Sequence, residues 1–172
     1  MANTYTLIAS NTLTGTTATV AFDNIPQTYT DLVLRISART GRTDPDYILL
    51  TFNTDTTSSG TTYSDTYIKG SGTAATSGRD SSGATIYDVG IPGVNQTSST
   101  FSSTEIYIPN YTISANKPFS SFSVTENNAT AADIWGGANL WRNTAAVTKI
   151  NMTAVSSFVS GSTFFLYGVK SS

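Results

Sequence analysis

The sequence predicts an all-β protein, a single-domain jelly-roll-like β-sandwich spanning residues 1–172, and three observations lead to this prediction. Thr and Ser account for 31 and 23 of the 172 residues, whereas charged residues make up only 12%. Thr, Tyr and Phe favour strands, and the helix formers Glu, Leu and Lys are scarce. Apolar and polar residues alternate with period two along the chain, which is typical of strands with one buried face. A closed up-and-down barrel is the structural alternative.

The N-terminal part contains the clearest predicted strands. Two alternating segments, 5–9 and 18–22, are expected to pair with each other through a polar loop. Segment 47–52 is apolar on both faces and is therefore expected to lie centrally in a sheet. In segment 32–38 the residues expected to face the core are Leu32, Leu34, Ile36 and Ala38. Those expected to face solvent or a partner are Val33, Arg35 and Ser37.

Residues 53–83 are rich in Ser, Thr, Gly and Asp, which predicts a long polar loop excursion on the surface. Within it Tyr63, Tyr67 and Ile68 allow a short strand or a turn of helix. Further strands are predicted at 84–89, 104–108, 119–125, 145–155 and 163–169, with 135–141 interrupted by two glycines. The core is expected to contain Phe22, Leu34, Leu50, Ile106, Phe122, Trp141, Ile150 and Phe165.

Charge and residue usage exclude several function classes. A net charge of -2 and a pI near 4.8 provide no basic field for phosphates, so nucleic acid is not an expected partner. The absence of His and Cys removes Ser-His-Asp and Cys-His catalysis, zinc fingers and disulfides. We therefore expect no enzyme activity and no metal or other cofactor. The N-terminus has no signal-peptide pattern and no stretch approaches the ~20 apolar residues of a membrane span, so no membrane association is expected.

The acidic residues provide only weak candidate sites. A glycosidase would need two carboxylates, and the only Glu residues are Glu105 and Glu126. Two Asx-rich turns, 44–46 and 53–55, cluster oxygen ligands as calcium loops do, but neither has the EF-hand spacing. We expect the two Glu residues to be solvated and these turns to be Asx turns that serve the backbone.

Aromatic residues are the remaining candidates for a binding surface. Exposed aromatic rings are the ordinary way in which a β-sandwich binds sugars, but rings that alternate within strands also pack in cores and at subunit interfaces. We expect core or interface packing, with a glycan platform as the alternative. The candidate residues are Tyr63, Tyr67, Tyr107, Tyr111, Trp135 and Trp141.

Five segments carry a further signal: FSSTEIYIPNY at 101–111, SVTENNAT at 123–130, LWRNTAAV at 140–147, FLYGVK at 165–170 and FDNIPQTYTDL at 22–32. Together they resemble a β-rich module of tailed-bacteriophage virion proteins. The resemblance covers most of the chain except residues 53–83. Modules of this kind occur alone and attached to larger tail or fibre proteins, and the family offers no catalytic residues.

This resemblance implies a non-enzymatic virion structural protein. The expected function is capsid decoration, in which a cement protein stabilises the phage head. The expected partners are the major capsid protein and copies of the chain in a homotrimer, and the expected location is the capsid surface after assembly in the host cytoplasm. The alternative is a tail-fibre or receptor-binding module that binds host surface glycans. A short chain without an attached anchoring domain or coiled-coil stalk favours decoration.

Overall fold

The computed structural model describes residues 4–55, 62–83, 85–87, 89–126 and 131–170, and these residues form strands and loops without a helix. The strands are β1 (Tyr5–Thr12), β2 (Thr17–Phe22), β3 (Asp31–Ser37), β4 (Asp46–Phe52), β5 (Tyr63–Gly70), β6 (Ala75–Gly83), β7 (Gly90–Ile91), β8 (Ser103–Ile108), β9 (Lys117–Glu126), β10 (Ala132–Trp141), β11 (Ile150–Phe158) and β12 (Thr163–Val169).

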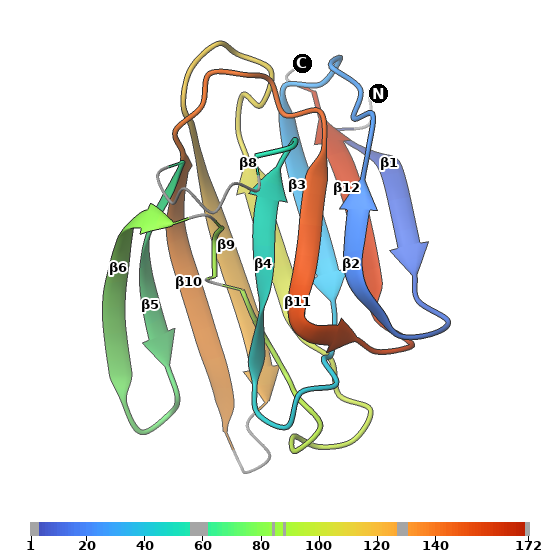
Figure 1. Ribbon diagram of the computed structural model, residues 1–172, viewed down its shortest axis with the longest axis vertical. Helices are drawn as coiled ribbons and strands as arrows, with labels where there is room; N and C mark the ends of the chain where they lie inside the picture. Colours follow the sequence, from blue (N-terminus) through green and yellow to red (C-terminus); the bar gives the residue numbers. More distant parts are fainter. Residues whose placement is uncertain (1–3, 56–61, 84, 88, 127–130, 171–172) are drawn as a thin grey trace.

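The strands form two antiparallel sheets that face each other, as Figure 1 shows. One sheet has eight strands in the order β1-β12-β3-β8-β9-β10-β5-β6, and the other has four in the order β2-β11-β4-β7. Without the hairpins β5-β6 and β9-β10, the strands form two four-stranded layers, β1-β12-β3-β8 and β2-β11-β4-β7. Along these eight strands the chain changes layer at every step except that from β4 to β7, which is the jelly-roll arrangement. The predicted β-sandwich is therefore confirmed, and two hairpins, β5-β6 and β9-β10, extend one of its sheets.

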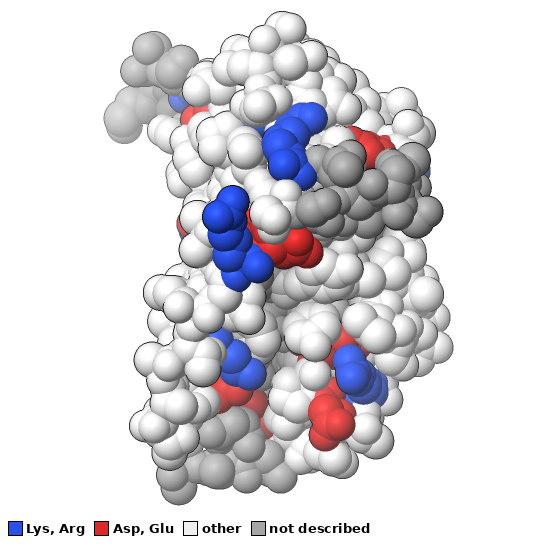
Figure 2. Space-filling model, turned by 60° about the vertical axis from the view of Figure 1, so that its left-hand side comes forward, with Lys and Arg blue, Asp and Glu red and all other residues white. Residues whose placement is uncertain are grey.

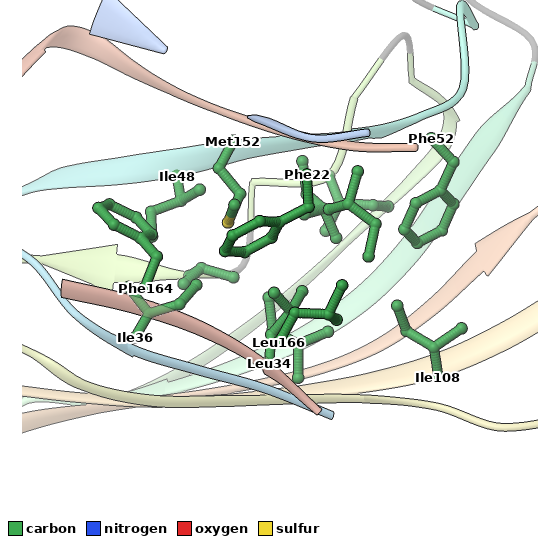
Figure 3. Close-up of a cluster of buried hydrophobic side chains, with 14 of the residues drawn as sticks. Phe22, Leu34, Ile36, Ile48, Phe52, Ile108, Met152, Phe164 and Leu166 are labelled. Atoms are coloured by element: carbon green, nitrogen blue, oxygen red, sulfur yellow. The ribbon is translucent and has the colours of Figure 1, made fainter. Parts of the chain in front are cut away.

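The core lies between the two sheets. Side chains of the four-stranded sheet, among them Phe22, Ile48, Phe52 and Met152, point toward Leu34, Ile36, Ile108, Phe164 and Leu166 of the eight-stranded sheet (Figure 3). All of these residues are at most 6% exposed. The predicted inward residues of segment 32–38 are all buried, and segment 47–52 lies inside its sheet as β4, as expected.

Two predicted core residues lie on the outer surface instead. Phe122 is 49% exposed on β9, where Phe119, Ser121 and Ser123 point inward. Phe165 is half-buried on the outer face of β12, between the buried Phe164 and Leu166. Both segments carry apolar residues in both parities, so alternation alone does not distinguish inside from outside.

One of the residues of segment 32–38 that are predicted to face outward is shielded from solvent. Val33 lies on the outer face of β3, but it is only 2% exposed. Its cross-strand partners are Tyr167 on β12 and Tyr107 on β8, and these large neighbours shield it from solvent. The expected pairing of segments 5–9 and 18–22 is wrong as well, because β1 pairs with β12 and β2 pairs with β11 in the other sheet.

Within the predicted polar excursion at 53–83, residues 63–83 form a β-hairpin rather than a loop, and residues 56–61 lie outside the described residues. Strands β5 and β6 pair through a turn at Ser71–Ala74, where Gly72 takes a positive φ of 82°. The sequence of β6 has little strand propensity, but pairing with β5 satisfies its backbone groups on one side. Its side chains are largely exposed, as the composition predicts.

Two other predicted strands differ from those in the structure. Residues 145–149 are irregular and β11 starts at Ile150. Segment 84–89 contains only an isolated bridge between Ile86 and Leu50, and residues 84 and 88 lie outside the described residues. The two-residue strand β7 follows it.

Candidate functional site

Three of the six aromatic candidates belong to the core. Tyr63, Tyr111 and Trp141 are fully buried, so they cannot form a surface platform. The Trp141 indole donates a hydrogen bond to Asp55 Oδ2 at 2.7 Å. The Tyr63 hydroxyl accepts one from the Phe52 amide at 2.8 Å, and burial raises the pKa of Tyr63. The Tyr111 hydroxyl donates to the Pro26 carbonyl, and burial raises the pKa of Tyr111 as well.

The remaining three candidates lie on two opposite faces of the eight-stranded sheet. Tyr107 is on the outer face and is 36% exposed. Its hydroxyl donates to Asp31 Oδ2 at 2.7 Å, and this hydrogen bond is the main reason why the pKa of Tyr107 rises to about 12. Tyr67 and Trp135 are on the inner face, because Tyr67 pairs with Gly137 on β10, two residues from Trp135. The structure therefore brings Tyr67 and Trp135 together at the surface, whereas Tyr63 and Trp141 stack on each other in the core with ring centroids 6.5 Å apart.

The inner face of the eight-stranded sheet is partly uncovered, and this creates a groove. Strands β10, β5 and β6 continue beyond β7, the last strand of the smaller sheet, so none of the strands among the described residues faces this end of the larger sheet (Figure 1). The resulting cavity has a volume of about 580 Å³. We call it the inner-face groove, and it is lined by Tyr47, Asp65, Tyr67, Lys69, Thr76, Gly78, Arg79, Asp80, Tyr87 and Trp135.

Aromatic rings form one wall of the inner-face groove. The rings of Tyr47 and Trp135 meet edge to face at a centroid distance of 6.0 Å, and Tyr47 meets Tyr87 in the same way at 6.3 Å. The Lys69 ammonium lies 4.2 Å from the centre of a Trp135 ring. A Cβ at Gly90 would lie 2.6 Å from the indole nitrogen of Trp135, so only glycine lets Trp135 pack this closely on β7. These contacts hold the wall in a defined position.

A fourth ring forms the floor of the inner-face groove. Tyr67 extends across the edge strand, and a Cβ at Gly78 would lie 2.5 Å from the Tyr67 Cζ and Oη atoms. Gly78 is the cross-strand partner of Tyr67, so the ring covers the backbone of β6 at a place without a side chain.

The polar lining of the inner-face groove contains both signs of charge. Lys69 and Arg79 supply two positive charges, and Asp65 and Asp80 supply two negative ones. Lys69 also lies 3.9 Å from Asp133 Oδ2. Figure 2 shows the same mixing over this side of the molecule, where Lys and Arg lie close to Asp and Glu between large uncharged areas.

The outer face of the eight-stranded sheet is a second candidate surface. An antiparallel sheet with one solvated face normally presents polar residues there. Here the outer face instead exposes the large apolar side chains Tyr5, Leu7, Ile68, Tyr107, Phe122 and Ile134. It also contains a depression of about 680 Å³ between Tyr107 and Arg79. An ion pair, Arg35 to Glu105 at 2.5 Å, lies within this face.

The carboxylates considered from the sequence have structural contacts. Glu105 pairs with Arg35, and Glu126 accepts hydrogen bonds from the Thr97 amide at 2.6 Å and its hydroxyl at 3.1 Å. Glu105 is opposite Phe122 on β9, so the two Glu residues are four positions apart along the strands. Their backbone positions are therefore roughly 13 Å apart at about 3.3 Å per residue, and each carboxylate is directed to a different partner, Arg35 or Thr97.

The two turns considered for calcium also serve the backbone. Asp46 is fully buried and accepts hydrogen bonds from the Thr40 hydroxyl at 3.0 Å and the Tyr47 amide at 2.8 Å. Asn53 accepts from the Thr148 amide at 2.8 Å. Within the described part of the chain, no cluster of three or more Asp and Glu residues could hold a metal ion.

Comparisons with known proteins provide no relative: no protein-family model, curated protein or solved structure matches this chain. No helix capable of spanning a membrane occurs among the residues that the structure describes. The inner-face groove and the outer face of the eight-stranded sheet are therefore the two candidate functional surfaces.

Proposed function

We propose that the protein is a non-enzymatic virion structural protein of a tailed bacteriophage, and that it decorates and stabilises the capsid. The proposal joins the resemblance of segments such as 101–111 to phage virion modules with one structural observation. That observation is the outer face of the eight-stranded sheet, where exposed aromatic and aliphatic side chains occupy positions that are normally polar.

The outer face suits docking on a neighbouring protein subunit. Protein interfaces are enriched in aromatic residues and depleted of charges at their centre, and Tyr107, Phe122 and Ile134 supply such a surface. We propose that this face contacts the major capsid protein at the particle surface and that the protein acts as a homotrimer. Binding is then driven by apolar burial and changes little with salt, since only 20 of the 172 residues are charged.

The test compares capsids with and without the protein. Capsids lacking it are expected to break more readily on heating or osmotic shock, and adding purified protein back is expected to restore them. Phe122→Glu and Ile134→Glu place charges on the outer face and should abolish rebinding. Val155→Glu is the matched control, because Val155 is 52% exposed on β11 of the other sheet. Equal loss of binding with all three variants would reject the outer face as the docking surface.

The inner-face groove favours a second candidate, a tail-associated module that binds host surface glycans. Tyr67 and Trp135 were both candidates for a glycan platform, and they lie together in this groove. Imaging particles with and without the protein distinguishes the two candidates. Density on the head supports decoration, whereas density at the tail together with lost host adsorption supports the second candidate.

A further inference from the structure

We infer that the inner-face groove binds a neutral saccharide, with the ring of Tyr67 as the stacking platform. This inference rests on the second candidate function, glycan binding, which it narrows to a ligand class and a stacking ring, and it does not depend on capsid decoration. It concerns the isolated protein and is tested on it.

The first argument is the position of the Tyr67 ring. It covers Gly78 on the edge strand, where any larger residue would collide with it at about 2.5 Å. The tip of the ring therefore lies close to the backbone of β6, while Tyr67 lines the cavity and is only partly buried. An accessible aromatic ring held in place by the backbone is suited to packing against the C–H groups of a sugar ring.

The second argument is that the remaining aromatic residues shape the site but do not offer the same platform. Trp135 is fixed between the Lys69 ammonium, 4.2 Å from its ring centre, and the backbone at Gly90. Tyr47 makes edge-to-face contacts with both Trp135 and Tyr87. These rings form a rigid wall beside the Tyr67 platform, and the volume of about 580 Å³ lies within the range of about 300–1,000 Å³ common for small-ligand sites.

The third argument is the charge of the lining, which selects the ligand class. Lys69 and Arg79, the second of which also borders the outer-face depression, lie among the three carboxylates of Asp65, Asp80 and Asp133, so the groove carries both signs of charge and no net positive charge. An anionic ligand would approach these carboxylates, and a cationic one would approach Lys69 and Arg79. Sugar hydroxyls donate and accept hydrogen bonds, so a neutral saccharide can pair with groups of both kinds. The balance also disfavours a nucleic acid, whose phosphates need a net positive surface.

The test begins with binding of the wild-type protein to an array of immobilised neutral and acidic glycans. The neutral set ends in glucose, galactose, mannose and N-acetylhexosamines, and the acidic set ends in sialic and uronic acids. Retention on neutral glycans is expected, and binding should be unaffected by moderate salt. Retention on none of the neutral glycans, or preference for acidic glycans, would overturn the inference.

Variants then locate the site, with the retained glycan titrated in solution and saturation-transfer NMR as readout. Tyr67→Ala is expected to weaken binding by about tenfold or more through loss of stacking. Gly78→Val should have a similar effect, because its side chain displaces the Tyr67 ring without deleting any polar group of the groove. The two variants check each other if one of them folds poorly.

Ile68→Ala is the matched control, because Ile68 neighbours Tyr67 on β5 but is 64% exposed on the opposite face of the sheet. Its binding is expected to equal that of the wild type. If Ile68→Ala weakens binding as much as Tyr67→Ala, or if folded Tyr67→Ala and Gly78→Val bind normally, the glycan binds elsewhere and the inference is wrong.

Discussion

Replacing Leu34 with Ala is expected to lower the free energy of unfolding by about 3–5 kcal/mol. Leu34 is fully buried on β3, between Leu166 of β12 and Ile106 of β8. The substitution removes an isopropyl group, and at ~0.8 kcal/mol per buried carbon the lost transfer free energy is about 2.4 kcal/mol. Hydrogen-bonded strands on both sides limit collapse of the site, so a remaining void of roughly 50–100 Å³ adds about 1–2.5 kcal/mol.

The assay is equilibrium unfolding in urea at one fixed protein concentration, which holds any contribution from oligomer assembly constant. A thermal scan should show the melting temperature falling by roughly 2–4 °C for each kcal/mol lost. Ile68→Ala serves as control because this side chain is 64% exposed, and a loss below about 1 kcal/mol is expected. A comparably small loss for Leu34→Ala would mean that Leu34 does not face the core, and the register of β3 would be refuted.

Three further predictions concern backbone packing and alkaline pH. Gly93→Ala should lower the free energy of unfolding in urea by more than about 2 kcal/mol, because the new Cβ would collide with the Asp44 carbonyl oxygen. Gly15→Ala is the control and should be nearly neutral, because no atom lies within 4 Å of a Cβ at that position. Burial lowers the pKa of Lys117 below its ordinary value of 10.5, so between the lowered pKa and pH 10.5 the unfolded chain binds more protons than the folded chain. The contribution of Lys117 to the free energy of unfolding should therefore rise with pH up to 10.5, and Lys117→Met should remove this rise. Folding raises the pKa of Tyr107 from 10.0 to about 12, so the contribution of Tyr107 to stability is complete below pH 10.0 and is lost as the pH rises toward 12. Tyr107→Phe should not show this loss of stability. Phenolate absorbance of the variant should show one fewer tyrosine that ionises near pH 12. An unchanged pH profile in either variant would contradict the corresponding assignment.

The buried Lys117 also shows how this chain holds its loops without disulfides. Its ammonium donates to the carbonyls of Ile113, Ala115 and Ala145 at 2.7, 2.5 and 3.0 Å. Arg39 acts in the same way on the loop after β7, with hydrogen bonds to the carbonyls of Gln96, Thr97 and Thr100. A scarce cation thus satisfies several backbone oxygens at once, which suits a chain with few charged residues.

The local sequence determined the fold class and much of the core. Abundant Thr and period-two alternation indicate strands wherever they occur, because strand geometry itself has a side-chain period of two. Where one parity is apolar throughout and the other is mostly polar, as around Leu34 and Ile36, the inward face follows directly. At Phe122 and Phe165 both parities are apolar, and the inward face depends on which neighbouring strands cover each side.

The tertiary structure alone decided the candidate sites. Tyr47, Tyr67, Tyr87 and Trp135 come from separate segments, and they meet because the β5-β6 hairpin pairs with β10 beyond the end of the smaller sheet. The composition of residues 53–83 indicates a loop, since the strand character of β6 comes from its hydrogen bonds to β5 rather than from its own side chains. Pairing between strands distant in sequence depends on the register of the whole sheet, whereas the alternation that indicates each strand is local.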